Sequence, residues 1–398
     1  MSDFTGTTGT TGTTGTTATT GTTGTTLYGR AVVQMAGLTA LLGDPLVTEG
    51  VIASGARISW DESVAPGEGF FSGKKQMPAF GEAKHLAHWQ PEVRAHICQC
   101  LLHEGLKLIT DKSDVNHPLV QLWYFDLKKP SGTIQGKSLV SISRPLLAVF
   151  EAQVLKVIAC SRPDLRRART AEILTQVLPQ VPYWSTLLPL SPWRTPWTWE
   201  LVGIVLTFVM QQVHRFKHEL AVPRPNELSP KVQPLLLTPG WSALPSGHAT
   251  EAFAFAHLMR ALLQEDGDTE LDSALQQQAK AISDNRVYAG LHYPVDGVAG
   301  RLLGATLAEY AVARCTSSAW VPRVFVGDAT ESLSGADLSL QDEVMPAGGG
   351  KVPAYYQIGT PAARVREEKT LAELWRRAQK EVQGLGFGHK SASPVEGQ

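Results

Sequence analysis

Residues 198–220 read TWELVGIVLTFVMQQVHRFKHEL and carry the strongest helical pattern in the chain. The uncharged apolar run within them, Leu201 to Val213, is thirteen residues long, whereas a membrane span needs about 20 apolar residues. We therefore expect a helix that packs inside a domain, and no transmembrane segment. Lys217 falls in the last turn of this helix, where the helix dipole favours a cation.

Apolar residues at helical spacing continue on both sides of this stretch, and strand-like patterns are short, as at Arg323–Val326. The sequence therefore predicts an all-α fold, a helical bundle with its functional residues at helix ends and in connecting loops. The other expected helices are 31–42, Pro91–Lys112, Leu146–Cys160, Thr170–Leu178, His248–Leu263, Leu271–Val287 and Val295–Cys315.

Composition divides the chain into three parts. Residues 1–30 form a low-complexity arm with Gly-Thr-Thr repeats, for which a flexible arm is favoured over one that packs on a neighbouring subunit. Residues 31–325 form the helical catalytic domain. Residues 326–398 form a loop-rich tail with one amphipathic helix, 370–382, whose docking onto the domain is favoured over a subunit contact.

Charge and cysteine content exclude some classes of function. A net charge of −1 with 18% charged residues provides no basic surface for nucleic acid. Four cysteines are too few for a disulfide framework, and the N-terminal residues lack the charged and apolar regions of a signal peptide. These features favour a cytoplasmic protein.

Three separated segments carry the chemistry, because together they supply three cations, two histidines and a hydroxyl. Cations and backbone N–H groups at a helix N-terminus are the groups that bind a tetrahedral oxyanion such as phosphate or vanadate. Each segment alone is typical of a turn, a helix start or a surface pair, but all three in order indicate one site. The segments are Lys217-x6-Arg224-Pro225, Pro245-Ser246-Gly247-His248 and Arg286-x5-His292-x3-Asp296.

The residue types suggest a division of roles. Lys217, Arg224 and Arg286 would hold the oxyanion, together with Ser246 and Gly247 at the start of the helix that follows them. The two histidines would act on opposite sides of the central atom. Asp296 could accept a hydrogen bond from Nδ1 of His292, which leaves Nε2 to attack or ligate, and His248 would then move protons.

The three segments, which cover about 80 residues, resemble the signature of the superfamily of type 2 phosphatidic acid phosphatases, bacterial acid phosphatases and vanadium-dependent haloperoxidases. The resemblance implies the helical fold of that superfamily. The chain departs from the signature at Asn285, where the third motif usually has serine. We expect this departure to tune the site without inactivating it.

The resemblance implies two enzymatic functions. In a haloperoxidase, His292 would ligate vanadate as the cofactor, with halide and hydrogen peroxide as substrates. In a phosphatase without a cofactor, His292 would become a phosphohistidine as a phosphoester is cleaved. A non-catalytic oxyanion-binding or assembly protein is a third possibility, and the superfamily's enzymes suggest a homo-oligomer.

The haloperoxidase is favoured by the missing membrane span, by the roughly 200 residues before the first motif, and by Trp241, at a position near the halide in haloperoxidases. His214 is expected to line the same substrate pocket. Two features favour the phosphatase instead: the short spacing of 38 residues from His248 to Arg286, and the sequence Leu291–Pro294.

Two other clusters are interpreted as structural. His96, Cys98, Cys100 and His103 lie on one expected helix, whereas tetrahedral zinc usually takes ligands from two elements. The tryptophans between residues 184 and 199 alternate with prolines and have few basic neighbours, which favours packing over base stacking.

Overall fold

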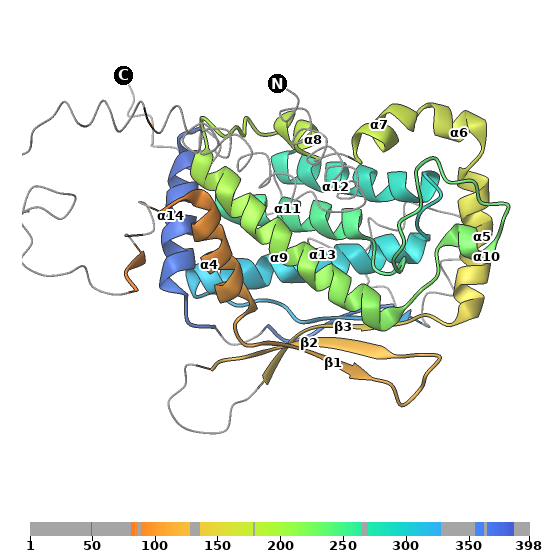
Figure 1. The fold of residues 1–398 in the computed structure, drawn as a ribbon, viewed down its shortest axis with the longest axis horizontal. Coiled ribbons are helices and arrows are strands. Elements are labelled where there is room, and N and C mark those ends of the chain that lie inside the picture. Colours follow the sequence, from red (N-terminus) through yellow and green to blue (C-terminus); the bar gives the residue numbers. More distant parts are fainter. Residues whose placement is uncertain are drawn as a thin grey trace, which may run out of the picture.

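A layer of helices covers one face of a β-sheet that has five strands among the described residues (Figure 1). This computed structural model describes residues 49, 81–83, 85, 89–127, 136–177, 180–264, 270–327, 355–361 and 364–385. The Gly-Thr-Thr arm, the expected helix 31–42 and the last dozen residues lie outside the described residues.

The helices follow the apolar pattern of the sequence closely where that pattern is long. The expected helix 198–220 is α9, and the helices of the second and third motifs are α11, α12 and α13. The helices are α4 (Pro91–His103), α5 (Leu147–Cys160), α6 (Pro163–Arg167), α7 (Thr170–Thr175), α8 (Val181–Ser185), α9 (Pro196–Leu220), α10 (Pro225–Leu228), α11 (Gly247–Leu263), α12 (Glu270–Tyr288), α13 (Pro294–Thr316) and α14 (Lys369–Gln383).

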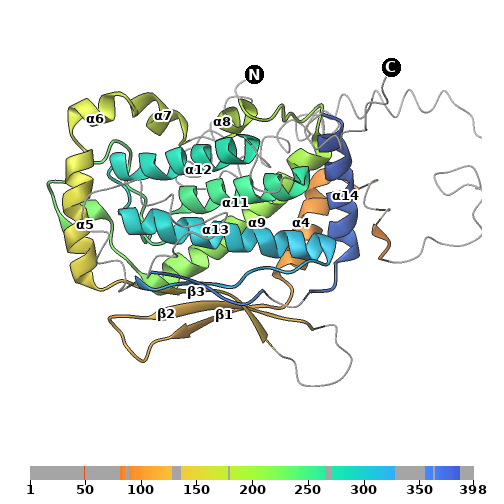
Figure 2. The ribbon, with the colours of Figure 1, turned by 180° about the vertical axis from the view of Figure 1, so that it is seen from behind.

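Helix α11 is the centre of the bundle, because it packs against α13, α12 and α9. Figure 2 shows α12, α11 and α13 as neighbouring layers. Two glycines on α13 let it approach α11 closely. A Cβ at Gly300 would lie 2.7 Å from the carbonyl oxygen of Ser246, and one at Gly304 would lie 2.3 Å from that of Thr250. This close approach holds the second and third motifs side by side.

The sheet has the strand order β1-β2-β3-β4-β5, with β3 and β4 parallel and the other pairs antiparallel. Its register places Leu108 opposite Leu122 and Val140 opposite Arg323. The parallel pair therefore joins the chain before the bundle to the chain after it. The strands are β1 (Leu106–Asp111), β2 (Leu119–Phe125), β3 (Gly136–Ser143), β4 (Arg323–Phe325) and β5 (Tyr356–Ile358).

The expected helical fold is confirmed, but the expectation that it is all-α is corrected by the sheet: the protein is mainly helical with an added mixed sheet. The expected helix Pro91–Lys112 ends at His103, because Gly105 adopts a left-handed φ of +80°. A Cβ at Gly105 would lie 2.2 Å from the carbonyl oxygen of Phe125. Beyond Gly105, side chains of β1 alternate between half-buried and exposed. Only the strand at Arg323 was expected, and it is β4.

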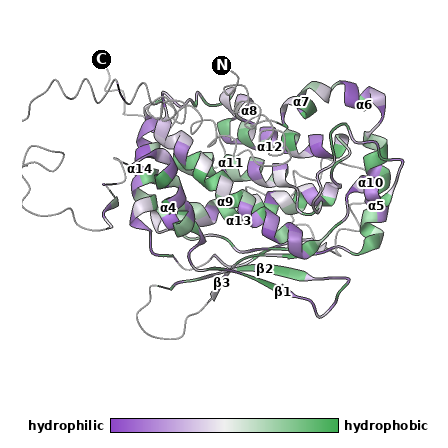
Figure 3. Ribbon diagram, viewed as in Figure 1, coloured by the Kyte–Doolittle hydropathy of each residue, from purple (hydrophilic) through white to green (hydrophobic). Residues whose placement is uncertain are grey.

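Helix α14 docks on the bundle, as its amphipathic pattern predicts, and packs against α9 and α13. Its apolar side chains are buried in the main core, and Glu381 accepts hydrogen bonds from the backbone N–H groups of Trp197 and Thr198 at the start of α9. The guanidinium groups of Arg94 and Arg377 lie over the Trp197 ring, 4.6 and 4.4 Å from its centroid. Figure 3 shows hydrophilic residues on the outer side of α14.

Candidate active site

The first motif is positioned by the end of α9. The helix ends at Leu220, and the C-cap residue Ala221 has a φ of 48° and donates its N–H to the carbonyl of Lys217. Lys217 is buried, and its Nζ donates to the carbonyl oxygens of Ser242 and Ala243 at 2.8 and 2.9 Å. The ammonium group therefore fixes the loop that leads into the second motif.

The second motif is positioned by the start of α11. Ser246 is the N-cap of this helix, and its hydroxyl accepts from the N–H of Ala249. The N–H of Ser246 donates to the carbonyl of Asp296 at 2.9 Å, so the first turns of α11 and α13 are tied together. Gly247 and His248, which follow Ser246, are buried.

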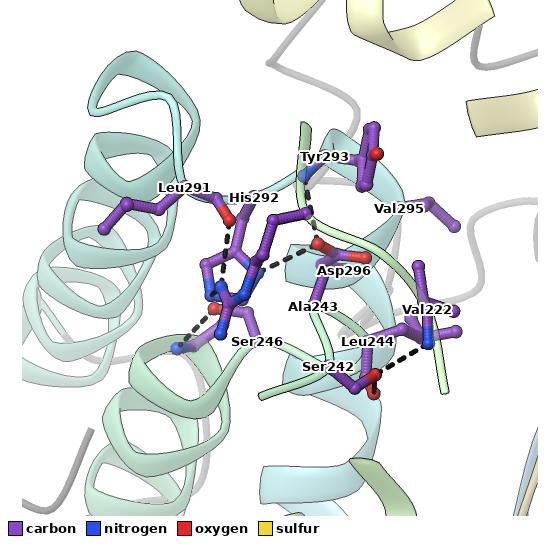
Figure 4. A network of polar contacts seen from close by, with 12 residues as sticks. Val222, Ser242, Ala243, Leu244, Ser246, Leu291, His292, Tyr293, Val295 and Asp296 are labelled. Atoms are coloured by element: carbon purple, nitrogen blue, oxygen red, sulfur yellow. Dashed lines mark hydrogen bonds and ion pairs between the residues drawn. The ribbon is translucent and has the colours of Figure 1, made fainter. Parts of the chain in front are cut away.

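The third motif places a histidine and a carboxylate at the start of α13 (Figure 4). Oδ2 of Asp296 lies 2.9 Å from Nδ1 of His292 and also accepts from the N–H of Tyr293 at 3.0 Å. Nη1 of Arg224 donates to Nε2 of His292 at 3.0 Å. These contacts assign the imidazole proton to Nδ1 and leave the lone pair on Nε2, which is the state required of a nucleophile or ligand.

Arg224 links the three motifs. Its Nε donates to the carbonyl of Trp241 at 2.8 Å, and its Nη1 donates to the carbonyl of Leu291 at 2.9 Å as well as to His292. Pro225 begins α10 directly after it, and Glu227 accepts from the N–H of Arg224. Because neighbours on both sides fix this arginine, its charge is held beside Nε2 of His292.

Arg286 and His248 meet at Gln176, the residue that follows α7. Nη2 of Arg286 donates to Oε1 of Gln176 at 2.9 Å, and Nε2 of His248 donates to the backbone carbonyl of Gln176 at 3.3 Å. Nε and Nη1 of Arg286 are buried and have no hydrogen-bond partner among the described residues. Such buried donors are costly unless a further acceptor binds them.

Burial and like charges set the protonation states of the cluster. Burial, followed by the charge of Arg224, lowers the pKa of His292, and burial, followed by the charge of Arg286, lowers the pKa of His248. Burial and the charge of Arg224 also lower the pKa of Lys217. Burial raises the pKa of Asp296, although the nearby charges of Lys217 and Arg224 oppose that rise. The positive charges of Lys217, Arg224 and Arg286 thus exceed the negative charge that Asp296 supplies to the cluster.

The arrangement fits a tetrahedral oxyanion. Three buried cationic side chains, Lys217, Arg224 and Arg286, contribute to the electrostatic environment of His248, which shows that the three motifs form one cluster. The orphaned nitrogens of Arg286 are suitable donors for such an anion, and Nε2 of His292 is the group that can approach its central atom. Phosphate and vanadate satisfy these requirements equally.

The two residues expected to line a halide pocket, His214 and Trp241, contact each other beside Lys217 and Arg224. The rings of His214 and Trp241 pack edge to face with centroids 5.4 Å apart. His214, on α9, is exposed and Trp241 is half-buried, and burial together with the charge of Lys217 lowers the pKa of His214. Trp241 contributes its backbone carbonyl to the cluster, through Arg224.

Two clusters were interpreted as structural: the histidines and cysteines of α4, and the tryptophans between residues 184 and 199. Among the described residues, no group of three or more potential ligands could hold a metal ion. Burial raises the pKa of the Cys98 thiol to about 12, as expected for a cysteine in a helix core. Trp184 is buried and stacks on Phe255, whereas Trp193 is exposed.

Sequence reasoning missed Gln176, because nothing in its local sequence distinguishes it. The signal lay at Asn285, whose side chain donates to Oε1 of Gln176 at 3.0 Å. The departure from the third motif thus marks the place where α7 contacts the site.

Comparison with known proteins agrees with this arrangement. Within the part of the chain that the structure describes, no helix has the length and apolar character needed to cross a membrane. No curated protein matches the chain. The family model of the PAP2 superfamily matches residues 197–317, which include α9 and all three motifs. This segment of the chain therefore belongs to the PAP2 superfamily.

Proposed function

We propose that the protein is a phosphatase that hydrolyses phosphate monoesters through a phosphohistidine on His292. The observation that carries this proposal is the state of the His292 imidazole. Its Nδ1–H is held by Asp296, and its Nε2 lone pair lies beside the guanidinium of Arg224. A buried, oriented nitrogen nucleophile next to an anion-binding charge is the arrangement that nucleophilic phosphoryl transfer requires.

In the first step, Nε2 of His292 attacks phosphorus as the bond to the leaving oxygen breaks. Lys217, Arg224 and Arg286 stabilise the charge on the phosphoryl oxygens. His248 in its protonated form donates a proton to the leaving alkoxide. The negative charge of the substrate favours that form, because it offsets the cations that lower the pKa of His248.

In the second step, neutral His248 takes a proton from water as the water oxygen attacks phosphorus. The bond from phosphorus to Nε2 breaks, which releases phosphate and restores the neutral imidazole of His292. Asp296 keeps its contact with Nδ1 in both steps, and it stabilises the positive charge on His292 while the phosphoryl group is attached.

A vanadate-dependent haloperoxidase is the second candidate. The same residues would hold vanadate, with Nε2 of His292 as its protein ligand, and vanadate would supply the activation of hydrogen peroxide toward halide. The half-buried ring of Trp241, whose carbonyl binds Arg224, is the observation that favours it. The exposure of His214 and the short spacing between His248 and Arg286 favour the phosphatase.

A paired assay separates the candidates. Purified protein is tested for hydrolysis of p-nitrophenyl phosphate, and, after addition of vanadate, for halogenation of a dye with hydrogen peroxide. The proposal predicts hydrolysis that vanadate inhibits and that His292→Ala abolishes. Halogenation without hydrolysis would overturn it in favour of the haloperoxidase, and oxyanion binding without either activity would favour a binding protein.

A further inference from the structure

Gln176 contacts two members of the candidate active site, although it lies outside all three motifs. Its side chain is fully buried. Its backbone carbonyl accepts from Nε2 of His248 at 3.3 Å, and its Oε1 accepts from Nη2 of Arg286 at 2.9 Å and from Nδ2 of Asn285 at 3.0 Å. One residue therefore touches both the expected proton donor and an anion-binding arginine.

The contacts of Arg286 show what Gln176 does. Nη2 donates to Gln176 and also to the backbone carbonyl of Ile173 at 3.3 Å. Nε and Nη1 have no partner among the described residues. Because a guanidinium is planar and rigid, fixing Nη2 from one side also fixes the directions of the N–H groups on Nε and Nη1. The contact therefore orients Arg286 and leaves its other donors for an oxyanion.

Asn285 fastens the α7 segment to α12. Its Oδ1 accepts from Nη1 of Arg169 at 3.0 Å, and its Nδ2 donates to Oε2 of Glu172 at 2.8 Å and to Oε1 of Gln176. These three partners are spaced three and four residues apart, so they lie on one face of the segment. A serine hydroxyl has a single proton to donate and a shorter reach, so it could not replace these contacts.

His248 is oriented by the same residue. Donation from Nε2 to the carbonyl of Gln176 assigns the proton of the neutral imidazole to Nε2 and leaves Nδ1 as the proton acceptor.

If the α7 segment only covered the site, its acceptors would bind all the N–H groups of Arg286 and leave none for an anion. Gln176 and Ile173 instead both contact Nη2 of Arg286, which fits a positioning role and not competition with the anion.

We propose that Gln176 and Asn285 are positioning residues, which act through Arg286 to align its N–H groups with the bound oxyanion. This inference rests on the oxyanion site of the proposed function. It holds whether that site hydrolyses phosphate esters or binds vanadate as a cofactor. Its test therefore measures the binding of an oxyanion separately from turnover.

The test compares Gln176→Leu and Asn285→Ala with the parent protein and with Gln212→Leu. Gln212 is also a buried amide, but its Oε1 accepts from Arg215 on α9. Binding of orthovanadate is measured by titration calorimetry, hydrolysis of p-nitrophenyl phosphate by steady-state kinetics, and folding by thermal unfolding. Each change is also made in an Arg286→Ala background, which removes the group through which the two residues act.

We expect Gln176→Leu to weaken orthovanadate binding roughly tenfold, as for one lost hydrogen bond to a charged group, and Gln212→Leu to leave it unchanged. In the Arg286→Ala background, Gln176→Leu should cause no further loss. Should Gln176→Leu fail to fold, Asn285→Ala carries the same expectation. Tighter binding, or an undiminished further loss without Arg286, would overturn the proposal. If the variants change orthovanadate binding as expected but the parent protein does not hydrolyse p-nitrophenyl phosphate, only the proposed phosphatase function would be overturned.

Discussion

Asp296, in the first turn of α13, holds His292, which precedes the helix, through a 2.9 Å contact between Oδ2 and Nδ1. The same oxygen accepts the N–H of Tyr293, so the carboxylate both orients the imidazole and begins the helix. Burial raises the pKa of the Asp296 carboxyl, and the positive charges of Lys217 and Arg224 oppose that rise and so favour the ionised carboxylate that this contact needs. The geometry of the proposed nucleophile is therefore set by the start of a helix.

Replacing Asp296 with asparagine should lower kcat by roughly 10²–10⁴-fold, because the amide cannot stabilise a positively charged His292 and can favour the wrong tautomer. The amide oxygen can still accept the N–H of Tyr293, so we expect the helix to remain intact. Steady-state kinetics and circular dichroism check both parts. A variant with full activity would show that the contact does not orient the nucleophile.

Replacing Lys217 with methionine should lower kcat/KM by about 10²–10³-fold, the usual effect of removing one group that stabilises transition-state charge. Inhibition by vanadate should weaken in parallel. Lys231→Met is the control, because Lys231 is an exposed residue of the loop between the first two motifs. Equal behaviour of the two variants would remove Lys217 from the oxyanion site.

Acid should destabilise the protein through its buried histidines. Burial lowers the pKa of His248, His257 and His292 below 6.5, so the unfolded chain binds more protons as the pH falls below about 6.5. Their contribution to stability is thus present above that pH and is lost as the pH falls toward the folded-state values. The raised pKa of Asp296 acts in the opposite direction, because the folded state then holds its proton more tightly.

Urea unfolding at pH 5.5 and 7.5 measures this loss. Each histidine that is neutral when folded adds up to about 1.4 kcal/mol per pH unit to the slope of the free energy of unfolding against pH. His257→Leu should therefore reduce this slope while the active site keeps both its histidines. An unchanged slope would mean that His257 binds protons equally in the folded and unfolded states.

Gly304→Ala should destabilise the protein by about 1–3 kcal/mol, because its Cβ would meet the carbonyl oxygen of Thr250 at 2.3 Å, and backbone atoms cannot move aside without separating α13 from α11. Activity should fall as well, since His248 lies at the start of α11 and His292 lies just before the N-cap of α13. Gly240→Ala is the control, because a Cβ there meets no atom within 4 Å. Chemical denaturation should separate the two variants, and equal stabilities would contradict the packing argument.

The long helices could be predicted from the sequence because each carries its own pattern. The ends of α9 and α13 differ from the expected bounds by one or two residues. The sheet could not be recognised in the same way, although β2 alternates between half-buried and buried residues. β4 and β5 have only three residues each, and Val140 of β3 pairs with Arg323 of β4, which follows the helices α5 to α13 in the sequence. Such pairing depends on the tertiary fold.

In the candidate site, too, the residues in local motifs could be predicted, whereas those that depend on the tertiary fold could not. The motifs specified the residues that the structure brings together, because helix ends place cations, hydroxyl and imidazoles by local geometry. Gln176 was not predictable, since its role depends on α7 packing against α12. The pocket role of Trp241 came from the resemblance and that of His214 from its position one helical turn before Lys217, and both stay predictions, although the two rings contact each other.

The central claim is that Nε2 of His292 takes up the phosphoryl group. It is tested most directly by mixing the protein with a radiolabelled phosphate monoester, quenching in alkali to preserve phosphohistidine, and mapping the labelled peptide by mass spectrometry. The account predicts label on His292 in the parent protein and none in His292→Ala. Label on another residue, or hydrolysis that continues in His292→Ala, would contradict it.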